Sequence, residues 1–433
     1  MEEIFHSVYL DKEKCMGCTT CLRSCPTAAI RISDGKARII KNKCIDCGEC
    51  IRVCPHQAKQ ARTTPLSEIK KYKYTVAIPA PTLLGQFEPH YSINAILTGL
   101  KALGFDEVVE VAYGAEIIGR GLALEIEKEH VQPLISSACP AVTKLIQIRF
   151  PELTKNISRL RAPMGMTARI VRKRLNETTS FTNEEIGIFF ITPCAAKATE
   201  VVNADPMEDL NAAVNGAISI KEIYPDLFAN IKNSKVEDLQ ISTVSGFSWA
   251  VSGGESAYLH DKKILHVDGI ANVISILEEI ENGKLPEIDF FEGLACIGGC
   301  VGGCLTVENN FIAKMYIEDR AKAEKEKSCK QISQPLIKKI YDSGMMHVKQ
   351  PIEPRVFKPL DPDFQKAIKK MQAIEKLEEE LPGLDCGSCG APSCRALAED
   401  IIAGKASKLD CIFMIKDKLL EYMDKKGSKE DES

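Results

Sequence analysis

Eight cysteines fall within the first 54 residues and form two copies of one spacing. The segment CMGCTTCLRSCP begins at residue 15 and CIDCGECIRVCP begins at residue 44, so the second copy follows the first after 29 residues. Each copy has the spacing C-x2-C-x2-C-x3-C-P, in which the fourth cysteine of one copy binds the cluster of the other. Soft thiolate ligands of this kind hold iron. The spacing therefore predicts two 4Fe-4S clusters, one bound by Cys15, Cys18, Cys21 and Cys54 and the other by Cys44, Cys47, Cys50 and Cys25.

A zinc site or a set of buried structural cysteines is the simpler alternative for this segment. A zinc site needs only paired C-x2-C motifs, so the third cysteine, the proline after each fourth cysteine and the duplication would all be unexplained. His56 follows the second Cys-Pro pair, but each cluster already has four thiolates, so we expect a surface or packing role for it. The segment resembles bacterial two-cluster ferredoxins, and this resemblance implies that it carries electrons.

A second group of cysteines comes from three distant segments. Cys139 follows the apolar run PLISSA, and Cys194 ends IGIFFITP in the same way, so both belong at the carboxyl ends of strands, where α/β sheets place ligands. Cys296 and Cys300 lie in EGLACIGGCVGGC, whose glycines allow the backbone to approach a bulky cofactor closely. Each could be an ordinary core cysteine. Their shared placement instead predicts one buried cluster site.

The last cysteine group has the spacing C-x2-C-x4-C-x16-C. A zinc site is chemically possible there. However, the opening LPGLDCGSCG resembles a small 4Fe-4S domain found in corrinoid, electron-transfer and sensory proteins, which implies a third accessory cluster bound by Cys386, Cys389, Cys394 and Cys411. Two cysteines remain: we interpret Cys304 as a small apolar residue, with a proton donor as the alternative, and Cys329 as an incidental thiol.

The elements that must position these groups alternate between strand and helix. The apolar runs TVAIPA, EVVEVAY, PLISSAC, IGIFFITPC, ILHVDGI and DFFEGLAC mostly lead into helix-like segments, which predicts an α/β domain with mainly parallel sheets over 75–365. An α+β two-cluster ferredoxin module over 1–62 precedes it. A charged helix over 364–380 leads into the last cysteine group, and together they predict a small helical 4Fe-4S domain over 366–424. We expect 425–433 to be a disordered tail.

Length and charge limit the function further. The chain has 433 residues, enough for about three domains, and 56 basic residues nearly balance 60 acidic ones. This balance argues against nucleic acid or an anionic membrane as a partner. The N-terminus is acidic where a signal peptide would be basic, and no apolar run is long enough to span a bilayer, so we expect a cytoplasmic protein. In a reducing compartment, 18 cysteines indicate metal binding or redox chemistry.

The central motifs resemble those of FeFe-hydrogenases, the iron-only hydrogenases. SSACP (136–140), TPCAAKATE (192–200) and EGLACIGGCVGGC (292–304) occur in that family's order, and APTLLGQFE (80–88) resembles its first strand-to-loop segment. The resemblance covers roughly residues 1–310. It implies an H-cluster, in which a 4Fe-4S cube held by Cys139, Cys194, Cys296 and Cys300 is joined through Cys300 to a diiron subsite with carbonyl, cyanide and a bridging dithiolate.

The resemblance also implies roles for other pocket residues. Lys197 would donate to a diiron cyanide, which suits an ammonium facing an anionic ligand, and Lys197 and Cys300 would be the catalytic residues. Glu200 would orient the loop that carries Lys197. The residues expected to contact the cofactor are Pro81, Thr82, Ala138, Pro193, Lys197, Glu200 and Leu294.

The pocket departs from that of rapid catalysts. Most active relatives have a proton-transferring cysteine where this chain has Ala138, and an alanine side chain cannot carry a proton. Arg120 and Gly121 stand near the expected acid, and Thr192 and Leu294 replace methionines. These differences are similar to those of the sensory type. The pattern predicts slow interconversion of dihydrogen with protons and electrons, serving hydrogen sensing through a redox partner such as ferredoxin or a signalling protein in trans.

Two alternatives stay open for the function. One is an ordinary catalytic, ferredoxin-linked hydrogenase. The other is a cluster-assembly scaffold that lacks the diiron unit. The loop TPCAAKATE, which carries Lys197, argues against the scaffold.

Overall fold

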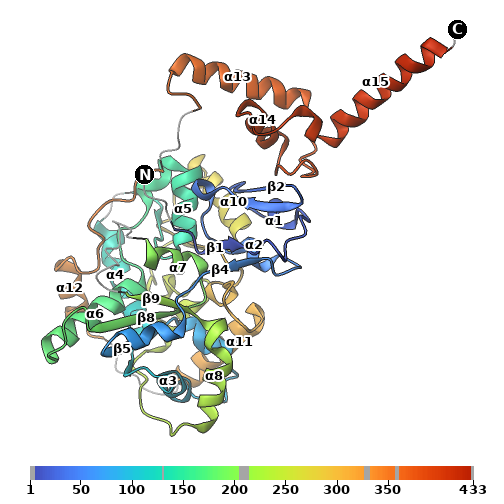
Figure 1. Ribbon diagram of the computed structural model, residues 1–433. Coiled ribbons are helices and arrows are strands. Elements are labelled where there is room, and N and C mark those ends of the chain that lie inside the picture. The colour runs from blue at the N-terminus through green and yellow to red at the C-terminus, as the bar shows by residue number, and fades with distance from the viewer. Residues whose placement is uncertain (1–4, 129–130, 204–213, 326–331, 356–359, 431–433) are drawn as a thin grey trace. The chain divides into compact units, whose positions relative to one another are not determined.

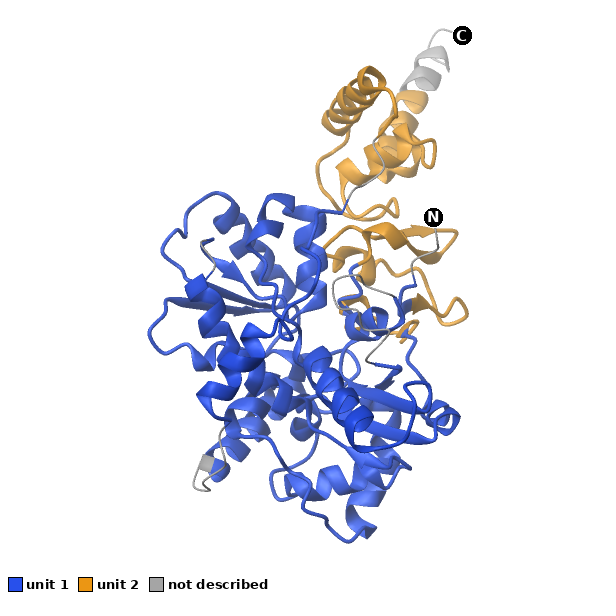
Figure 2. Ribbon diagram, turned by 90° about the vertical axis from the view of Figure 1, so that its left-hand side faces the viewer, with its two compact units in different colours: residues 1–8, 45–48, 61–355 blue, residues 9–44, 49–60, 356–433 orange. Residues whose placement is uncertain are grey.

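The computed structural model describes residues 5–128, 131–203, 214–325, 332–355 and 360–430. Figure 1 shows the helices and strands of the chain, which forms two compact units that Figure 2 colours separately. The first unit comprises residues 1–8, 45–48 and 61–355, and the second comprises 9–44, 49–60 and 356–433. Cys329 lies outside the described residues. No helix among the described residues is both long and apolar enough to cross a bilayer.

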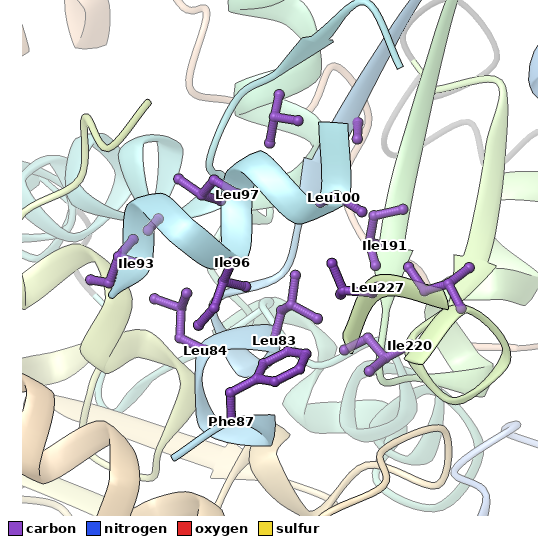
Figure 3. Packing of buried hydrophobic residues seen from close by; sticks show 14 of the residues in the cluster. Leu83, Leu84, Phe87, Ile93, Ile96, Leu97, Leu100, Ile191, Ile220 and Leu227 are labelled. Carbon is purple, nitrogen blue, oxygen red and sulfur yellow. The ribbon is translucent and has the colours of Figure 1, made fainter. Parts of the chain in front are cut away.

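The larger sheet of the first unit has four parallel strands in the order β6-β5-β8-β9. All seven residues of β8 are buried, as expected for a parallel sheet that helices cover on both faces. Leu97 of α3, Leu227 of α8 and Ile191 of β8 belong to one buried hydrophobic cluster, and Figure 3 labels them. These elements are β5 (Tyr74–Pro79), β6 (Glu107–Val108), β8 (Ile186–Thr192), β9 (Gly216–Ser219), α3 (Ile93–Lys101) and α8 (Ile220–Asn233).

The smaller sheet has three parallel strands in the order β10-β11-β7. Phe291 of β11 packs with Val142 of α5 and Leu277 of α10 in the core beside this sheet. The elements are β7 (Leu134–Ile135), β10 (Ile264–Asp268), β11 (Phe290–Leu294), α5 (Pro140–Arg149) and α10 (Ile270–Glu281). The predicted mainly parallel sheets are confirmed. All six apolar runs contain a strand, whereas β9, with the short sequence GAIS, was not predicted.

The remaining helices of the first unit surround the two sheets. Two of them, α11 and α12, follow the last central cysteines. Both are anchored in the core, because Ile317 of α11 and Ile337 of α12 are buried in core clusters. These helices are α4 (Val111–Lys128), α6 (Pro163–Thr178), α7 (Ala195–Val202), α9 (Val244–Phe247), α11 (Asn310–Lys325) and α12 (Gln334–Asp342).

The second unit contains the repeated cysteine segments and the C-terminal helices. The repeat is visible in its elements: each copy has one short helix, α1 or α2, followed by a strand, β2 or β4. β2 pairs with β3, and β4 pairs with β1. The elements are β1 (Val8–Leu10), α1 (Thr20–Arg23), β2 (Ile30–Ser33), β3 (Lys36–Ile39), α2 (Glu49–Arg52) and β4 (Lys59–Ala61).

The C-terminal helices have a small core of their own. Ile374 and Leu377 of α13 pack with Leu397 of α14 and with Cys411. Helix α13 (Phe364–Glu380) has the predicted bounds, and α14 (Cys394–Ile402) follows it. Helix α15 (Ile412–Glu430) extends over residues 425–430, which we had expected to be a disordered tail. The predicted boundaries of the three domains stay predictions.

Candidate functional site

The central cysteines stand where strands of both sheets end. Cys139 is the N-cap residue of α5 and comes soon after β7, while Cys194 is the N-cap residue of α7 directly after β8 and Pro193. Cys296 follows β11, and Cys300 begins a short 3-10 helix, Cys300–Gly302. Strands from two separate sheets therefore bring their carboxyl ends to one place, as the rule for α/β sheets predicts.

These cysteines line a single pocket with an open volume of about 730 Å³, the space at its mouth included. Its surface is almost entirely apolar, with Phe190, Met164 and Trp249 among the walls. The structure brings together there the predicted residues Pro81, Thr82, Ala138, Cys139, Pro193, Cys194, Lys197, Leu294, Cys296 and Cys300. Glu200 does not line this pocket.

The pocket makes its thiols hard to ionise without a cation. Burial raises the pKa of the Cys139, Cys194 and Cys300 thiols, and neighbouring cysteines of the same group raise each of them further. Lys197 acts in the opposite direction on Cys300. Because thiolates rather than thiols bind metals, a group of neutral buried thiols becomes a ligand set only when a bound cation replaces their protons.

Local backbone structure fixes where the cysteines point. The hydroxyl of Thr192 accepts the backbone N–H of Cys194 at 3.1 Å, which holds the turn between β8 and α7. Gly299 has a φ of 99°, and a Cβ there would lie 2.7 Å from the backbone nitrogen of Ser252. A Cβ on Gly303 would lie 2.3 Å from the carbonyl oxygen of Pro193. Gly299 and Gly303 are therefore required by close backbone contacts around the pocket.

Lys197 and Glu200 form an ion pair beside the cysteines. Lys197 Nζ lies 2.8 Å from Glu200 Oε2, and the two side chains are only 10% and 8% exposed. They stand three residues apart on α7, so one turn of helix sets their separation. Glu200 thus contacts the lysine rather than the cavity, which agrees with the positioning role proposed for it.

The predicted departures from a rapid catalyst do not all meet at the pocket. Ala138 and Leu294 line it. Thr192 is fully buried, and its hydroxyl is hydrogen-bonded to the turn that follows β8. Among the described residues, neither Thr192 nor Gly121 lines the pocket. A Cβ on Gly121 would come within 2.5 Å of Met346 Sδ, because this face of α4 packs against the segment after α12. The expectation that all these differences cluster around one pocket was therefore wrong.

Sequence reasoning missed a buried acid pair near Ala138. Ser136 Oγ donates to Glu255 Oε2 at 2.5 Å and accepts the backbone N–H of Ala138 at 3.1 Å. Burial, and the charge of the neighbouring Glu292, raise the pKa of Glu255 to about 8. Burial also raises the pKa of Glu292, although Ser256 and Gly253 donate hydrogen bonds to it. No periodicity or spacing identifies Glu255, because its partner Ser136 lies 119 residues away.

The cysteines of the repeated segment form two groups in the second unit. Burial raises the pKa of Cys21, and the charges of Cys18, Cys54 and Cys15 raise it further. Burial likewise raises the pKa of Cys50, with further contributions from Cys44 and Cys25. Cys54 of the second copy thus acts on Cys21, and Cys25 of the first copy acts on Cys50, although Cys21 also acts on Cys50. The two ligand sets stay predictions. The eighth cysteine, Cys47, belongs to the first unit, where it packs against the core cluster that also contacts Cys139 and Cys194.

The C-terminal cysteines also come together within one core. The charges of Cys411 and Cys386 act on the Cys389 thiol, whose pKa burial raises. Cys394 and Cys389 pack against the same cluster, which contains Cys411. His56, for which no ligand role was expected, is exposed.

The described residues fit the cofactors that the sequence implies. Four thiols in the pocket suit an iron-sulfur cube, and its apolar walls suit ligands that must be kept from water. Thr82 Oγ1 is fully buried beside the pocket and has no hydrogen-bond partner among the described residues. A buried hydroxyl without a partner is costly, so a polar group of a bound cofactor would satisfy it.

Fold and site together define an iron-sulfur protein with a buried four-cysteine pocket between two parallel sheets. The family described as the iron-only hydrogenase large subunit, C-terminal domain, matches residues 73–260 and 227–304, which together are more than half of the chain. The chain belongs to this family of iron-only hydrogenases. A 4Fe-4S dicluster domain matches residues 7–55, and an Fe-S cluster family matches residues 381–413.

Individual relatives include a hydrogenase and a cluster assembly factor. The periplasmic Fe hydrogenase large subunit of Nitratidesulfovibrio vulgaris is 28% identical over 362 residues, which are 69% of this chain and 86% of that protein. A cytosolic Fe-S cluster assembly factor of Yarrowia lipolytica is 26% identical over 101 residues, 23% of this chain and 21% of that protein. A structure of a variant of FeFe-hydrogenase HydA1 from Chlamydomonas reinhardtii covers 67% of this chain and 98% of its own, with a TM-score of 0.54 and 16% identity, and so shares the fold.

Proposed function

We propose that this protein interconverts dihydrogen with two protons and two electrons at an H-cluster held in the pocket. The observation that carries the proposal is the meeting of Cys139, Cys194, Cys296 and Cys300 with Lys197 around one buried cavity. Four thiolates satisfy a cube, and the Lys197 ammonium is a charged donor suited to an anionic ligand beyond it. When bound, the H-cluster supplies an iron site at which hydrogen is split heterolytically.

The chain's own residues would bind, orient and shield that site. Cys300 would bridge the cube to the diiron subsite, and Lys197 would donate to a cyanide. Glu200 would hold the Lys197 side chain in place through the 2.8 Å ion pair. Apolar walls such as Phe190 and Trp249 would exclude water, which strengthens the electrostatic contacts inside.

The finer part of the proposal is slow turnover in the service of hydrogen sensing. Ala138 lines the pocket and offers no group that can take or give a proton. Gly121 packs against Met346, so this position does not supply the missing acid either. Three accessory 4Fe-4S clusters would carry electrons between the pocket and a partner, either a ferredoxin or a signalling protein in trans. We place this activity in the cytoplasm.

An infrared spectrum tests the proposal most directly. Full-length protein matured with the diiron cofactor should show carbonyl and cyanide bands, which have no source in an ordinary iron-sulfur protein. Cys300→Ser should abolish them, whereas Cys304→Ser, a change four residues further along the same loop, should leave them in place. Absence of the bands from matured wild-type protein, with a full complement of 4Fe-4S clusters, would instead favour a cluster-assembly scaffold.

Hydrogen turnover by the matured protein separates the two remaining possibilities. A sensor of this kind should turn over far more slowly than a relative with the proton-transferring cysteine. Turnover equal to that of such a relative would make the protein an ordinary ferredoxin-linked hydrogenase.

A further inference from the structure

Lys59 is a buried lysine inside the cysteine-rich part of the second unit. It is the first residue of β4, and only 2% of its surface is exposed. Its Nζ has no hydrogen-bond partner among the described residues. An ammonium removed from water without a partner is strongly unfavourable, so a buried lysine of this kind requires a compensating negative charge.

The position of Lys59 indicates where that charge comes from. Ala58, the residue before Lys59, belongs to the buried cluster that contains Cys21 and against which Cys50 packs. In agreement with this placement, the positive charge of Lys59 opposes the effect of burial on the pKa of both the Cys21 and the Cys50 thiol. Cys21 belongs to one predicted ligand set and Cys50 to the other. The ammonium is therefore close enough to influence both cluster positions, and an iron core with four thiolates is an anion.

The two copies of the internal repeat differ at the position of Lys59. The first copy continues Cys25-Pro-Thr-Ala-Ala and then Ile30, and the second continues Cys54-Pro-His-Gln-Ala and then Lys59. Ile30 begins β2 as Lys59 begins β4, and Ile30 is also 2% exposed. Two equivalent buried positions thus hold an apolar residue in one copy and a cation in the other, so the fold itself does not demand the charge.

We propose that Lys59 is a buried counter-ion shared by the two ferredoxin-type clusters, and that it raises the reduction potential of both. Reduction adds one electron to a cluster, so its reduced state carries one more negative charge than its oxidised state. A fixed cation stabilises the more negative state, and it does so more strongly in a buried site than in water. No atom is transferred, and the electron comes from whatever reduces the cluster. In the context of the proposed function, on which this part rests, the higher potential favours movement of electrons from the pocket into the module.

The experiment uses the full chain with its 4Fe-4S clusters assembled from iron and sulfide and without the diiron subsite. Anaerobic titration with dithionite and redox mediators, followed by low-temperature EPR, gives the midpoint potential of each cluster. Lys59→Ile places in the second copy the residue that the first copy has, and Lys59→Met keeps the length of the side chain. Both changes should shift both ferredoxin-type clusters to more negative potentials. The C-terminal cluster, identified by its loss in Cys386→Ser, should keep its potential and so serves as an internal reference.

Two further variants separate charge from other effects. Lys59→Arg keeps the positive charge and should keep potentials close to those of the wild type. Lys36 is an exposed lysine whose Nζ donates to the carbonyl oxygen of Cys15 at 2.7 Å. Lys36→Met therefore removes a positive charge from the same module, but water and salt already screen that charge. It should produce a much smaller shift than Lys59→Met.

Each outcome decides the proposal. Wild-type potentials in Lys59→Ile and Lys59→Met, with both clusters retained, would overturn it. Loss of the clusters from these two variants but not from Lys59→Arg would support a counter-ion that is also needed for binding. Loss from all three would show that the lysine side chain matters through its shape and would overturn the proposal as well. Because the diiron subsite takes no part, a failure here leaves the proposed hydrogenase function standing.

Discussion

Ser136 Oγ donates a 2.5 Å hydrogen bond to Glu255 Oε2, and this bond joins the end of β7 to a carboxyl group that is almost inaccessible to water. The same hydroxyl accepts the backbone N–H of Ala138, which lines the pocket. A single hydroxyl, that of Ser136, therefore connects the backbone of Ala138 to the buried carboxyl group of Glu255. This acid has consequences for stability and for proton transfer that can be measured separately.

The first prediction concerns stability and pH. The pKa of Glu255 rises from an ordinary value of 4.5 to about 8 in the folded chain. Between these values the unfolded chain has lost the proton that the folded chain keeps, so the free energy of unfolding falls as pH rises through this window. Glu255→Gln cannot ionise and still accepts from Ser136. The free energy of unfolding of Glu255→Gln minus that of wild type should therefore increase from about pH 5 to about pH 8, by on the order of a few kcal/mol.

Denaturant unfolding at these two pH values provides the measurement for Glu255→Gln. Glu281→Gln is the control, because Glu281 is an exposed glutamate on α10 of the same unit. It should show the same pH dependence as wild type. An equal pH dependence in wild type and Glu255→Gln would mean that Glu255 is not held protonated in the native state.

The second prediction restores a proton carrier at the pocket wall. A positioned acid or base contributes about 10²- to 10⁴-fold to a proton-transfer step. Ala138→Cys should raise hydrogen turnover detectably but by less than this factor, because Gly121 has no side chain that could pass the proton onward. Ala138→Ser, whose hydroxyl is a far weaker acid of similar size, should give a smaller gain. Rapid turnover by wild type with no gain from Ala138→Cys would remove the main physical support for sensing.

Some parts of the site could be predicted because neighbouring residues in the sequence encode them. Cys194 and Lys197 lie three residues apart, so the start of one helix places both at the same cavity. Cysteine spacing likewise indicated that cysteines of the two copies lie near one another, since Cys54 acts on Cys21 and Cys25 acts on Cys50. The alternation of strands and helices was enough to predict the parallel sheets. A continuous apolar run such as β8 is typical of a strand that helices cover on both faces.

Other parts depended on contacts between distant segments. Trp249 reaches the pocket wall from a short 3-10 turn that no motif marks. Gly121 was placed near the expected acid from its position in the sequence, but the helical rotation of α4 and the packing of Met346 decide which way that position faces. Lys59 left a signal that was overlooked: it breaks the match between the two repeat copies at a position where the first copy has Ile30.

The third prediction concerns Lys197 and Glu200. Lys197→Ala should keep the 4Fe-4S clusters but lose most of the diiron unit, because the anionic subsite would lose its charged donor. It also leaves Glu200 buried without its cation, a change that costs about 3–5 kcal/mol when a buried pair is broken. Lys197→Arg keeps the charge and should retain more of the carbonyl and cyanide bands. Unchanged bands in Lys197→Ala would show that the lysine does not hold the subsite.

The fourth prediction concerns the C-terminal cysteines. Because Ile374 and Leu377 of α13 belong to the core around Cys411, a clean deletion must begin before α13. A chain ending at residue 355 should lose the iron and sulfide of one 4Fe-4S cluster and keep the rest. Cys389→Ser in the full chain should reduce the iron content by the same amount. A loss of much more than one cluster on deletion would show that other clusters depend on these helices.

The last prediction decides the role of Cys304. Its charge acts on the Cys194 thiol, and the next residue, Leu305, donates its backbone N–H to the carbonyl oxygen of Pro193 at 3.0 Å, so the segment lies directly behind the loop that carries Cys194. Among the described residues that line the pocket, Cys304 is absent, which favours a packing role over proton delivery. Cys304→Ala should therefore leave iron content unchanged and hydrogen turnover within about twofold of wild type, since removing a well-positioned acid would cost 10²-fold or more. If Cys304→Ala instead abolishes turnover while Cys304→Ser, with a much weaker acid, fails to restore it, protons reach the site through this thiol. The slow turnover expected from Ala138 would then need a different explanation, because Cys304 would take the place of the missing proton carrier.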